Sequence, residues 1–226
     1  MLDERLSLAA SLYEPCEWGA DIGTDHAFLP CHLLRTGICQ YMIAADVSEN
    51  ALARARENLT RQHLIDQAKV VLADGLNAVT RPCGCISIMG MGGELMARIL
   101  REGQNKLQGA VLVLGAHTEL HLVREAIQAI GYHIVQERLC KAASRFYVFW
   151  RAEGGSADMS AEELRYGRLL WQNDKALLQE YATWRRRVHQ DKERGVLAAA
   201  VRNEEAIREV QADISWYTTK LEELTC

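Results

Sequence analysis

Two acidic residues and a glycine lie close together near the start of the chain. Asp21, Gly23 and Asp25 belong to the segment 20–30, ADIGTDHAFLP, which begins at the end of the short apolar run 18–22 and leads into a helical pattern. A strand, a glycine turn and a helix in this order are typical of nucleotide-binding α/β domains. Gly23 allows a tight turn and a close approach of the backbone to a ligand. The two carboxylates favour a ligand that carries hydroxyl groups and positive charge.

The same segment argues against a dinucleotide. It has neither the three-glycine fingerprint of dinucleotide-binding turns nor the lysine of a phosphate-binding loop. An NAD-dependent dehydrogenase is therefore an alternative, but this sequence lacks the glycine fingerprint that such an enzyme requires. The sulfonium and the amino group of S-adenosylmethionine are both cationic, so we predict a site for S-adenosylmethionine.

A third acid follows the next predicted strand. Asp46 ends the apolar run 41–45, a little over twenty positions after Gly23, which is the spacing of an acid that binds ribose hydroxyls. The other role for such an acid is to cap the following helix. Because Ser48 is itself a good cap for that helix, we favour the ribose role for Asp46.

Asp74 and Gly75 follow the predicted strand 69–73. A carboxylate at this place can accept a hydrogen bond from the amino group of an adenine, although Asp-Gly is also a common turn. Asp74 gains weight because it is one of several acids at carboxyl ends of strands, where ligands of open α/β sheets bind.

A glycine-rich loop follows the predicted strand 85–89. Residues 90–93 read Gly-Met-Gly-Gly and precede a helix over 94–102. Three glycines in four positions allow the backbone to approach a ligand more closely than a plain strand-to-helix connection requires. Met89 and Met91 have two open roles, since they can pack against a target base or fill the core.

The whole pattern predicts an α/β fold of two domains. A helix within 3–13 and five strand–helix units precede two strands near 133–139 and 146–151, which indicates a Rossmann-like, seven-stranded sheet of order 3-2-1-4-5-7-6 with an antiparallel seventh strand. Glycines at 154 and 155 mark a linker. We therefore place a cofactor-binding catalytic domain at 1–153 and a helical domain at 157–226.

The helical domain shows heptad spacing over two long stretches, with a break near 202–204. This predicts an antiparallel coiled-coil hairpin whose apolar seam contains Leu177, Tyr181, Trp184, Val188, Ile207, Val210, Ile214, Tyr217, Leu221 and Leu224. The first helix carries a basic cluster of Arg185, Arg186, Arg187 and Lys192. Such a cluster is either a solvated helix face or a contact with an RNA backbone.

Composition sets limits on the class of protein. The net charge of −4 does not indicate a strongly basic nucleic-acid protein, although a local basic face remains compatible with RNA. The seven cysteines are scattered, and the Cys83-Gly-Cys85 pair has no second pair at zinc-ligand spacing. We expect free thiols, no metal, no membrane segment and a cytoplasmic protein.

The segment 20–30, the loop 89–93 (MGMGG) and the helical tail together resemble the bacterial tRNA (adenine(22)-N1)-methyltransferases, and the resemblance covers nearly the full chain. It implies S-adenosylmethionine as methyl donor, N1 of adenine 22 in the tRNA D-loop as acceptor, and a coiled-coil domain that helps to hold the tRNA. It implies a cofactor pocket made by Asp21, Gly23, Asp25, His26, Asp46, Asp74, Gly75, Gly90, Met91 and Gly92. Within that set we expect Asp25, His26 and Met91 to position the reacting groups.

One segment departs from the family pattern. Family members have Gln-Pro-Asn after the fifth strand, and here Gly115-Ala116-His117 occupies that place. The departure keeps two alternatives open, namely a methyltransferase with another RNA base or a small-molecule acceptor, and a non-catalytic module that binds the cofactor. We expect a monomer or a weak dimer.

Overall fold

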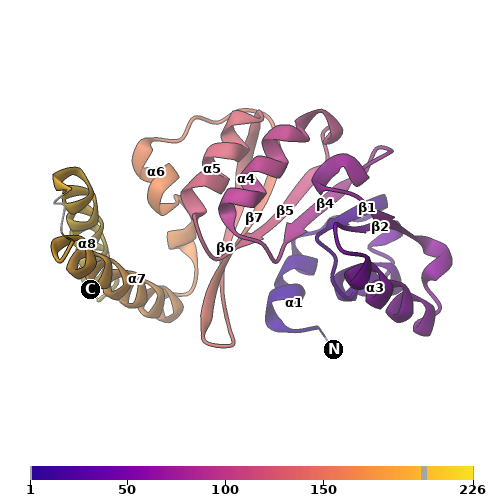
Figure 1. Ribbon diagram of the computed structural model, residues 1–226, viewed down its shortest axis with the longest axis horizontal. Coiled ribbons are helices and arrows are strands. Elements are labelled where there is room, and N and C mark those ends of the chain that lie inside the picture. The colour runs from indigo at the N-terminus through magenta and orange to yellow at the C-terminus, as the bar shows by residue number, and fades with distance from the viewer. Residues whose placement is uncertain (1, 200–202, 226) are drawn as a thin grey trace. The chain divides into compact units, whose positions relative to one another are not determined.

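The computed structural model describes residues 2–199 and 203–225. These residues form two compact units, with the boundary between Leu170 and Trp171. The first unit is built on a seven-stranded sheet in the order β3-β2-β1-β4-β5-β7-β6, which confirms the predicted order (Figure 1). Its strands are β1 (Cys16–Ile22), β2 (Cys39–Asp46), β3 (Ala68–Leu72), β4 (Cys85–Met89), β5 (Val111–Ala116), β6 (Tyr132–Ala142) and β7 (Arg145–Gly154).

Strands β1 to β5 are parallel, and β7 runs antiparallel to both β5 and β6. The strands β1, β2, β4 and β5 are short apolar runs because helices cover both faces of a parallel sheet. The β6–β7 hairpin is longer than the spacing predicted, since β7 pairs with β6 along its whole length from Arg145 to Gly154.

Five α-helices of the first unit connect or cover the strands: α1 (Glu4–Ser11), α2 (Phe28–Arg35), α3 (Glu49–Arg61), α4 (Gly93–Glu102) and α5 (Leu120–Ala129). Right-handed crossovers place α2 and α3 on one face of the sheet and α4 and α5 on the other. Figure 1 shows α4 and α5 side by side, and α1 contacts α2 and the strands β5, β6 and β7. Ser48 caps α3 as predicted, because its Oγ accepts from the amide of Ala51 at 3.4 Å.

Short 3-10 turns complete the first unit: η1 (Ile65–Gln67), η2 (Gly75–Ala78) and η3 (Gln104–Lys106). The strand order reverses between β1 and β4, so the two halves of the sheet diverge at the carboxyl ends of these strands. Such a switch point is the place where open α/β sheets bind ligands.

The segment that was predicted to begin the helical domain belongs to the first unit. Residues 157–170 contain a short helix, α6 (Ala161–Tyr166), and the start of η4 (Leu169–Gln172), and they do not form part of the two long helices. The guanidinium of Arg124 donates to Glu137 at 2.6 and 2.8 Å, and both side chains are only 1% exposed. Arg124 also donates to the carbonyl of Leu164, and Glu137 accepts from the amide of Leu170, so this buried pair holds the segment in place.

The second unit contains two long helices, α7 (Lys175–Leu197) and α8 (Glu204–Thr225). Their contacts run in opposite directions along the chain, because Gln179 donates to the carbonyl of Leu224 while Gln211 donates to Glu193. The hairpin is therefore antiparallel, as predicted. At about 1.5 Å per residue each helix extends roughly 30–35 Å. Of the predicted break at 202–204, Arg202 lies outside the described residues, and Asn203 caps α8 through the amide of Ala206.

The predicted seam of the hairpin is only partly correct. Tyr181, Ile207 and Tyr217 are buried as expected, but Trp184 is 37% exposed and Leu178 is buried in place of Leu177. The seam also contains polar groups, since His189 Nδ1 lies 3.1 Å from Asp213 Oδ2 and both side chains are buried. Heptad spacing of apolar residues gives no sign of a buried polar pair, so the sequence could not predict it.

Within residues 2–199 and 203–225, no helix has the length and apolar character needed to cross a membrane. The same residues contain no group of three or more His, Cys, Asp or Glu side chains arranged to hold a metal ion.

Candidate active site

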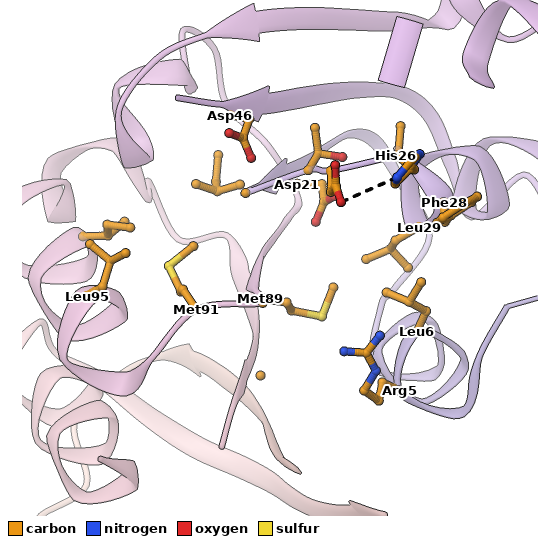
Figure 2. Close-up of a pocket in the computed structure, with 18 of the residues that line it drawn as sticks. Arg5, Leu6, Asp21, His26, Phe28, Leu29, Asp46, Met89, Met91 and Leu95 are labelled. Carbon is orange, nitrogen blue, oxygen red and sulfur yellow. Dashed lines mark ion pairs between the residues drawn. The ribbon is translucent and has the colours of Figure 1, made fainter. Parts of the chain in front are cut away.

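A cavity of about 960 Å³ opens at the carboxyl ends of the parallel strands. That volume is at the upper end of the range of about 300–1,000 Å³ for small-molecule sites. Figure 2 shows Asp21 and Asp46 at the strand ends, Leu95 on one side of the cavity, Arg5 and Leu6 on the other, and Met89 and Met91 between these two sides. All the predicted cofactor residues line the cavity except Gly92.

Asp21 is the buried acid of the cavity, with an exposed fraction of 6%. Its Oδ1 accepts a hydrogen bond of 2.6 Å from Ser87 on β4, and Ser87 Oγ accepts one of 2.7 Å from the hydroxyl of Tyr13. Burial raises the pKa of Asp21 above its ordinary value of 3.8, although the hydrogen bond from Ser87 opposes the rise and the nearby Asp46 adds to it. A cationic ligand would favour the ionised form of Asp21.

The turn after β1 contacts the end of β2. Gly23 has a positive φ of +82°, and its amide donates to the carbonyl of Ala45 at 2.8 Å, which ties the turn to the end of β2. A Cβ at Gly23 would come within 3.0 Å of Met91 and 3.2 Å of the carbonyl of Met89. Glycine is therefore required here both by conformation and by space.

Asp46 lies at the end of β2 and lines the cavity. Its Oδ1 accepts a hydrogen bond of 2.8 Å from the amide of Ser48, which fixes the carboxylate at the start of α3. Of the two roles considered for Asp46, the helix cap belongs to Ser48, and Asp46 orients the turn before the helix. The ribose role of Asp46 stays a prediction.

Asp25 and His26 lie at the rim of the cavity. The side chain of Asp25 is 61% exposed and forms an ion pair with Arg54 of α3, while His26 Nε2 lies 3.7 Å from Asp25 Oδ2. The ring of His26 stacks on Phe28 with centroids 5.2 Å apart. Both acidic and aromatic groups therefore face solvent at the rim of the cavity. The sequence did not indicate that Arg54 is the partner of Asp25.

Asp74 and Gly75 lie on the adjacent side of the cavity, after β3. Asp74 Oδ2 is 3.8 Å from Arg98 of α4, and the side chain of Asp74 is 59% exposed. A Cβ at Gly75 would meet Ile99 at 3.1 Å, so α4 packs directly against this turn. The exposed apolar residues Val47 and Leu95 also line the cavity.

The glycines of the loop 90–93 have different physical roles. Gly90 has a positive φ of +75°, and no atom lies within 4 Å of the place where its Cβ would be. Gly93 is required for packing, because a Cβ there would come within 2.5 Å of the carbonyls of Thr118 and Glu119. Met91 lines the cavity, whereas Gly92 caps α4 through the amide of Met96 at 3.1 Å.

A basic and aromatic wall, which contains Arg5, His117 and Tyr147, closes the other side of the cavity. The guanidinium of Arg5 on α1 lies over the ring of Tyr147 on β7 at 5.2 Å, and the rings of His117 and Tyr147 have centroids 5.5 Å apart. Asp3 accepts from Arg5 at 2.7 Å and raises the pKa of its guanidinium. The contact of Arg5 with Tyr147 joins residues that are far apart in the sequence, so no local pattern predicts it.

The departing segment 115–117 belongs to this wall. A Cβ at Gly115 would come within 2.6 Å of the ring of Phe149, so glycine makes room for an aromatic side chain from β7. His117 lines the cavity beside Tyr147. The wall therefore has an aromatic ring and an imidazole in contact where the sequence showed only a change of motif.

The residues at the strand ends fit a cationic nucleoside cofactor. Asp21 is a buried carboxylate without a cationic partner among the described residues, and Asp46 and Asp74 follow it around the cavity. Gly90 leaves open space beside the backbone where a ligand can approach. The acidic side chains at these strand ends accept hydrogen bonds and attract positive charge, which suits hydroxyl, amino and sulfonium groups and does not suit a phosphate.

The basic cluster of the second unit is divided between two environments. Arg185 Nε donates to the hydroxyl of Tyr217 at 3.1 Å, and its terminal nitrogen lies 3.1 Å from His189, so Arg185 belongs to the seam. Arg186 is partly exposed, and Arg187 and Lys192 are exposed. Consecutive helical residues point in different directions, which separates Arg185 from its neighbours.

Comparisons with known proteins agree with this geometry. The family profile for tRNA (adenine(22)-N(1))-methyltransferase, TrmK, matches residues 19–218. A tRNA (adenine(22)-N(1))-methyltransferase of Bacillus subtilis (strain 168) is 30% identical over 159 residues, which are 70% of this chain and 67% of that protein.

Solved structures show the same similarity. A candidate tRNA (m1A22) methyltransferase of Streptococcus pneumoniae has a TM-score of 0.85 and 30% identity, with 98% of this chain and 100% of that chain covered. The structure of that protein in complex with S-adenosyl-L-methionine has a TM-score of 0.82 over the same coverage. Because the family profile spans most of the sequence, the chain belongs to the tRNA (adenine(22)-N(1))-methyltransferase family.

Proposed function

We propose that this protein transfers a methyl group from S-adenosylmethionine to N1 of adenine 22 in tRNA. The observation that carries the proposal is one cavity with carboxylates at the strand ends and a basic, aromatic wall opposite them. Family membership supports the donor and the acceptor, and we assign the two chemically different sides of the cavity to these two ligands.

The acidic side would hold the donor. When bound, S-adenosylmethionine would supply a methyl group on a positively charged sulfur: the lone pair of adenine N1 would attack the methyl carbon, and the thioether S-adenosylhomocysteine would leave as the carbon–sulfur bond breaks. Asp46 would accept hydrogen bonds from ribose hydroxyls, and Asp74 would accept one from the adenine amino group of the donor. Asp21 places a buried negative charge at the strand end, where it favours positive charge in the cavity.

The basic and aromatic side would hold the acceptor. Tyr147 offers a ring face for stacking an unpaired base, and aromatic stacking contributes about 1–3 kcal/mol per base. Arg5, whose guanidinium lies over that ring, would bind the phosphate beside the base. His26 and Phe28 at the mouth would contact the nucleotide as it enters, and D-loop bases are more easily turned outward than paired ones.

Positioning accounts for the reaction better than proton transfer does. N1 of adenine already has a lone pair, so no residue must remove a proton before attack. Orientation of two reactants can lower a barrier by roughly 7–11 kcal/mol. A general base typically contributes about 10²–10⁴-fold in rate, which is only roughly 3–5 kcal/mol. We therefore propose that Asp25, His26 and Met91 act by placing the base and donor and not by acid–base catalysis.

The decisive experiment measures methyl transfer from labelled S-adenosylmethionine to unmodified tRNA, followed by mass spectrometry of the nucleosides. We expect 1-methyladenosine, and we expect it to disappear when adenine 22 is replaced. Donor binding without any methylated nucleoside would support a non-catalytic module, and a different methylated nucleoside would support another acceptor.

Two predictions about the whole protein accompany this function. Because tRNA is the substrate, we expect the protein in the cytoplasm. We also expect a monomer or a weak dimer, and light scattering across a range of concentrations measures that state.

A further inference from the structure

Four cysteines that are scattered in the sequence gather at the amino end of the sheet, away from the cavity. Cys16, Cys39 and Cys85 are the first residues of β1, β2 and β4, and Cys83 comes just before β4. Because β2, β1 and β4 are neighbouring parallel strands, three thiols lie at the same end of the sheet. None of these cysteines has a role in the proposed methyl transfer.

Cys16 and Cys39 form the closest pair. They are register partners on the neighbouring parallel strands β1 and β2, so their side chains point to the same face of the sheet. Their sulfur atoms are 3.5 Å apart. Neighbouring strands lie about 4.8 Å apart, and this spacing falls within the Cα separation of about 4.4–6.8 Å that disulfides span.

The two thiols have different surroundings. Cys16 is partly exposed, whereas Cys39 is only 1% exposed. The thiol of Cys39 lowers the pKa of Cys16, burial opposes this effect, and the backbone amides of Cys85 and Gly84 strengthen it. Cys16 is thus the accessible thiol with the greater thiolate character, and thiolates are the attacking species in disulfide exchange.

Close backbone packing keeps the pair in place. A Cβ at Gly84 would come within 2.6 Å of the Cβ of Cys16, and a Cβ at Gly19 would come within 2.9 Å of the sulfur of Cys39. Glycine at these two positions leaves room for the sulfur atoms beside the strands. The part of the chain that the structure describes offers no metal site that includes these thiols.

We propose that Cys16 and Cys39 form a site for reversible thiol–disulfide exchange with small disulfides such as oxidised glutathione. The Cys16 thiolate attacks one sulfur of the glutathione disulfide, which forms a mixed disulfide and releases one glutathione thiolate. The Cys39 thiol then gives its proton to the released glutathione thiolate and attacks the sulfur of Cys16, which releases the second glutathione thiolate. Two protein thiols are oxidised and one glutathione disulfide is reduced to two thiols.

The link would close a loop of the chain that contains the donor side of the cavity. Residues between Cys16 and Cys39 include the segment 20–30 with Asp21, Gly23 and Asp25. A disulfide stabilises chiefly by restricting the unfolded chain. The thiols lie at the amino ends of the strands and the cavity lies at the carboxyl ends, so oxidation should stabilise the fold without a change in donor affinity.

The test incubates the full-length protein with oxidised glutathione at neutral pH and counts thiols that an alkylating reagent can still modify after denaturation. We expect two fewer thiols, a mass lower by about 2 Da than that of the reduced protein, and a peptide that links Cys16 to Cys39. We expect the melting temperature to rise by roughly 5 °C, with donor affinity within about twofold of that of the reduced protein.

Matched variants make the result decisive. Cys16→Ser and Cys39→Ser should each abolish the linked peptide, and Cys39→Ser should leave a stable mixed disulfide at Cys16. Cys83→Ser, a change in the same cluster, should still form the link. The proposal is wrong if the wild-type protein forms only a mixed disulfide, if Cys16 links to Cys83 or Cys85 instead, or if no thiol is lost.

Discussion

The buried acid Asp21 should make donor binding depend on pH. Burial raises its pKa above 3.8, so Asp21 becomes ionised only at a higher pH than an exposed aspartate does. The ionised form attracts a cationic donor, and donor affinity should therefore rise with pH and level off above the pKa of Asp21. Calorimetric titration of S-adenosylmethionine between about pH 4 and pH 8 measures this curve.

The raised pKa of Asp21 has the opposite effect on the stability of the ligand-free protein, which should fall as pH rises. A carboxyl group whose folded pKa is raised stabilises the fold at low pH, and that contribution is lost as pH rises through the raised pKa. Asp21→Asn should remove this loss and weaken donor binding by about 10- to 100-fold, because hydrogen bonds to charged groups contribute about 1.5–3 kcal/mol. Unchanged donor affinity in the Asp21→Asn variant would show that Asp21 does not hold the donor.

Tyr147 should affect the acceptor and not the donor. Its ring is in contact with Arg5 and His117 on the wall opposite the carboxylates. Tyr147→Ala should reduce kcat/KM for tRNA by about 10- to 100-fold, as expected for the loss of one stacked base at about 1–3 kcal/mol. Tyr147→Phe keeps the ring and should retain most of the activity, and both variants should bind S-adenosylmethionine as the wild type does. Weaker donor binding in Tyr147→Ala would move Tyr147 to the donor side.

At the scale of elements, the buried pair Arg124–Glu137 should decide the stability of the first unit. Glu137 also accepts from the indole of Trp150 at 2.8 Å and from the amide of Leu170 at 3.0 Å. Glu137→Ala would leave the guanidinium of Arg124 buried without its carboxylate, which typically costs about 3–5 kcal/mol. We expect the melting temperature to fall by roughly 10 °C.

The exposed pair Arg98–Glu102 provides the control for this prediction. Glu102 is 63% exposed, so Glu102→Ala should change the free energy of unfolding by at most about 1 kcal/mol. Gly167→Ala tests the same anchor from the other side, because a Cβ at Gly167 would come within 2.9 Å of both Arg124 and Glu137. If Glu137→Ala were as mild as Glu102→Ala, the pair would not hold the segment 157–170.

The features that the sequence predicted well are those repeated by each strand–helix unit. Asp21, Asp46 and Asp74 each lie at the carboxyl end of a predicted strand, and a parallel sheet must bring such ends together, so the gathering of these acids around one cavity was predictable. The contacts of Arg5 with Tyr147, of Arg124 with Glu137 and of Cys16 with Cys39 depend on strand register and helix packing. No periodicity in one segment reports on these, and the helical start at 157 was misplaced for the same reason.

At the scale of the whole molecule, the exposed basic residues of α7 should determine how tRNA affinity responds to salt. Arg186, Arg187 and Lys192 are at least partly exposed, whereas Arg185 is engaged by Tyr217 and His189. If these three residues bind phosphates, their replacement by Ala removes up to three counterion-releasing contacts. The slope of log affinity against log salt should then decrease in magnitude by about 2.

Filter binding of tRNA between about 50 and 200 mM salt measures that slope. The triple variant should bind S-adenosylmethionine normally, because none of the three residues lines the cavity. A matched triple variant of Arg35, Arg101 and Lys106 in the first unit removes the same charge and should leave the slope nearly unchanged. Equal slopes for all three proteins would show that the exposed basic residues of α7 are only solvated. The tRNA contacts would then have to lie on the first unit, around Arg5 and the rim of the cavity.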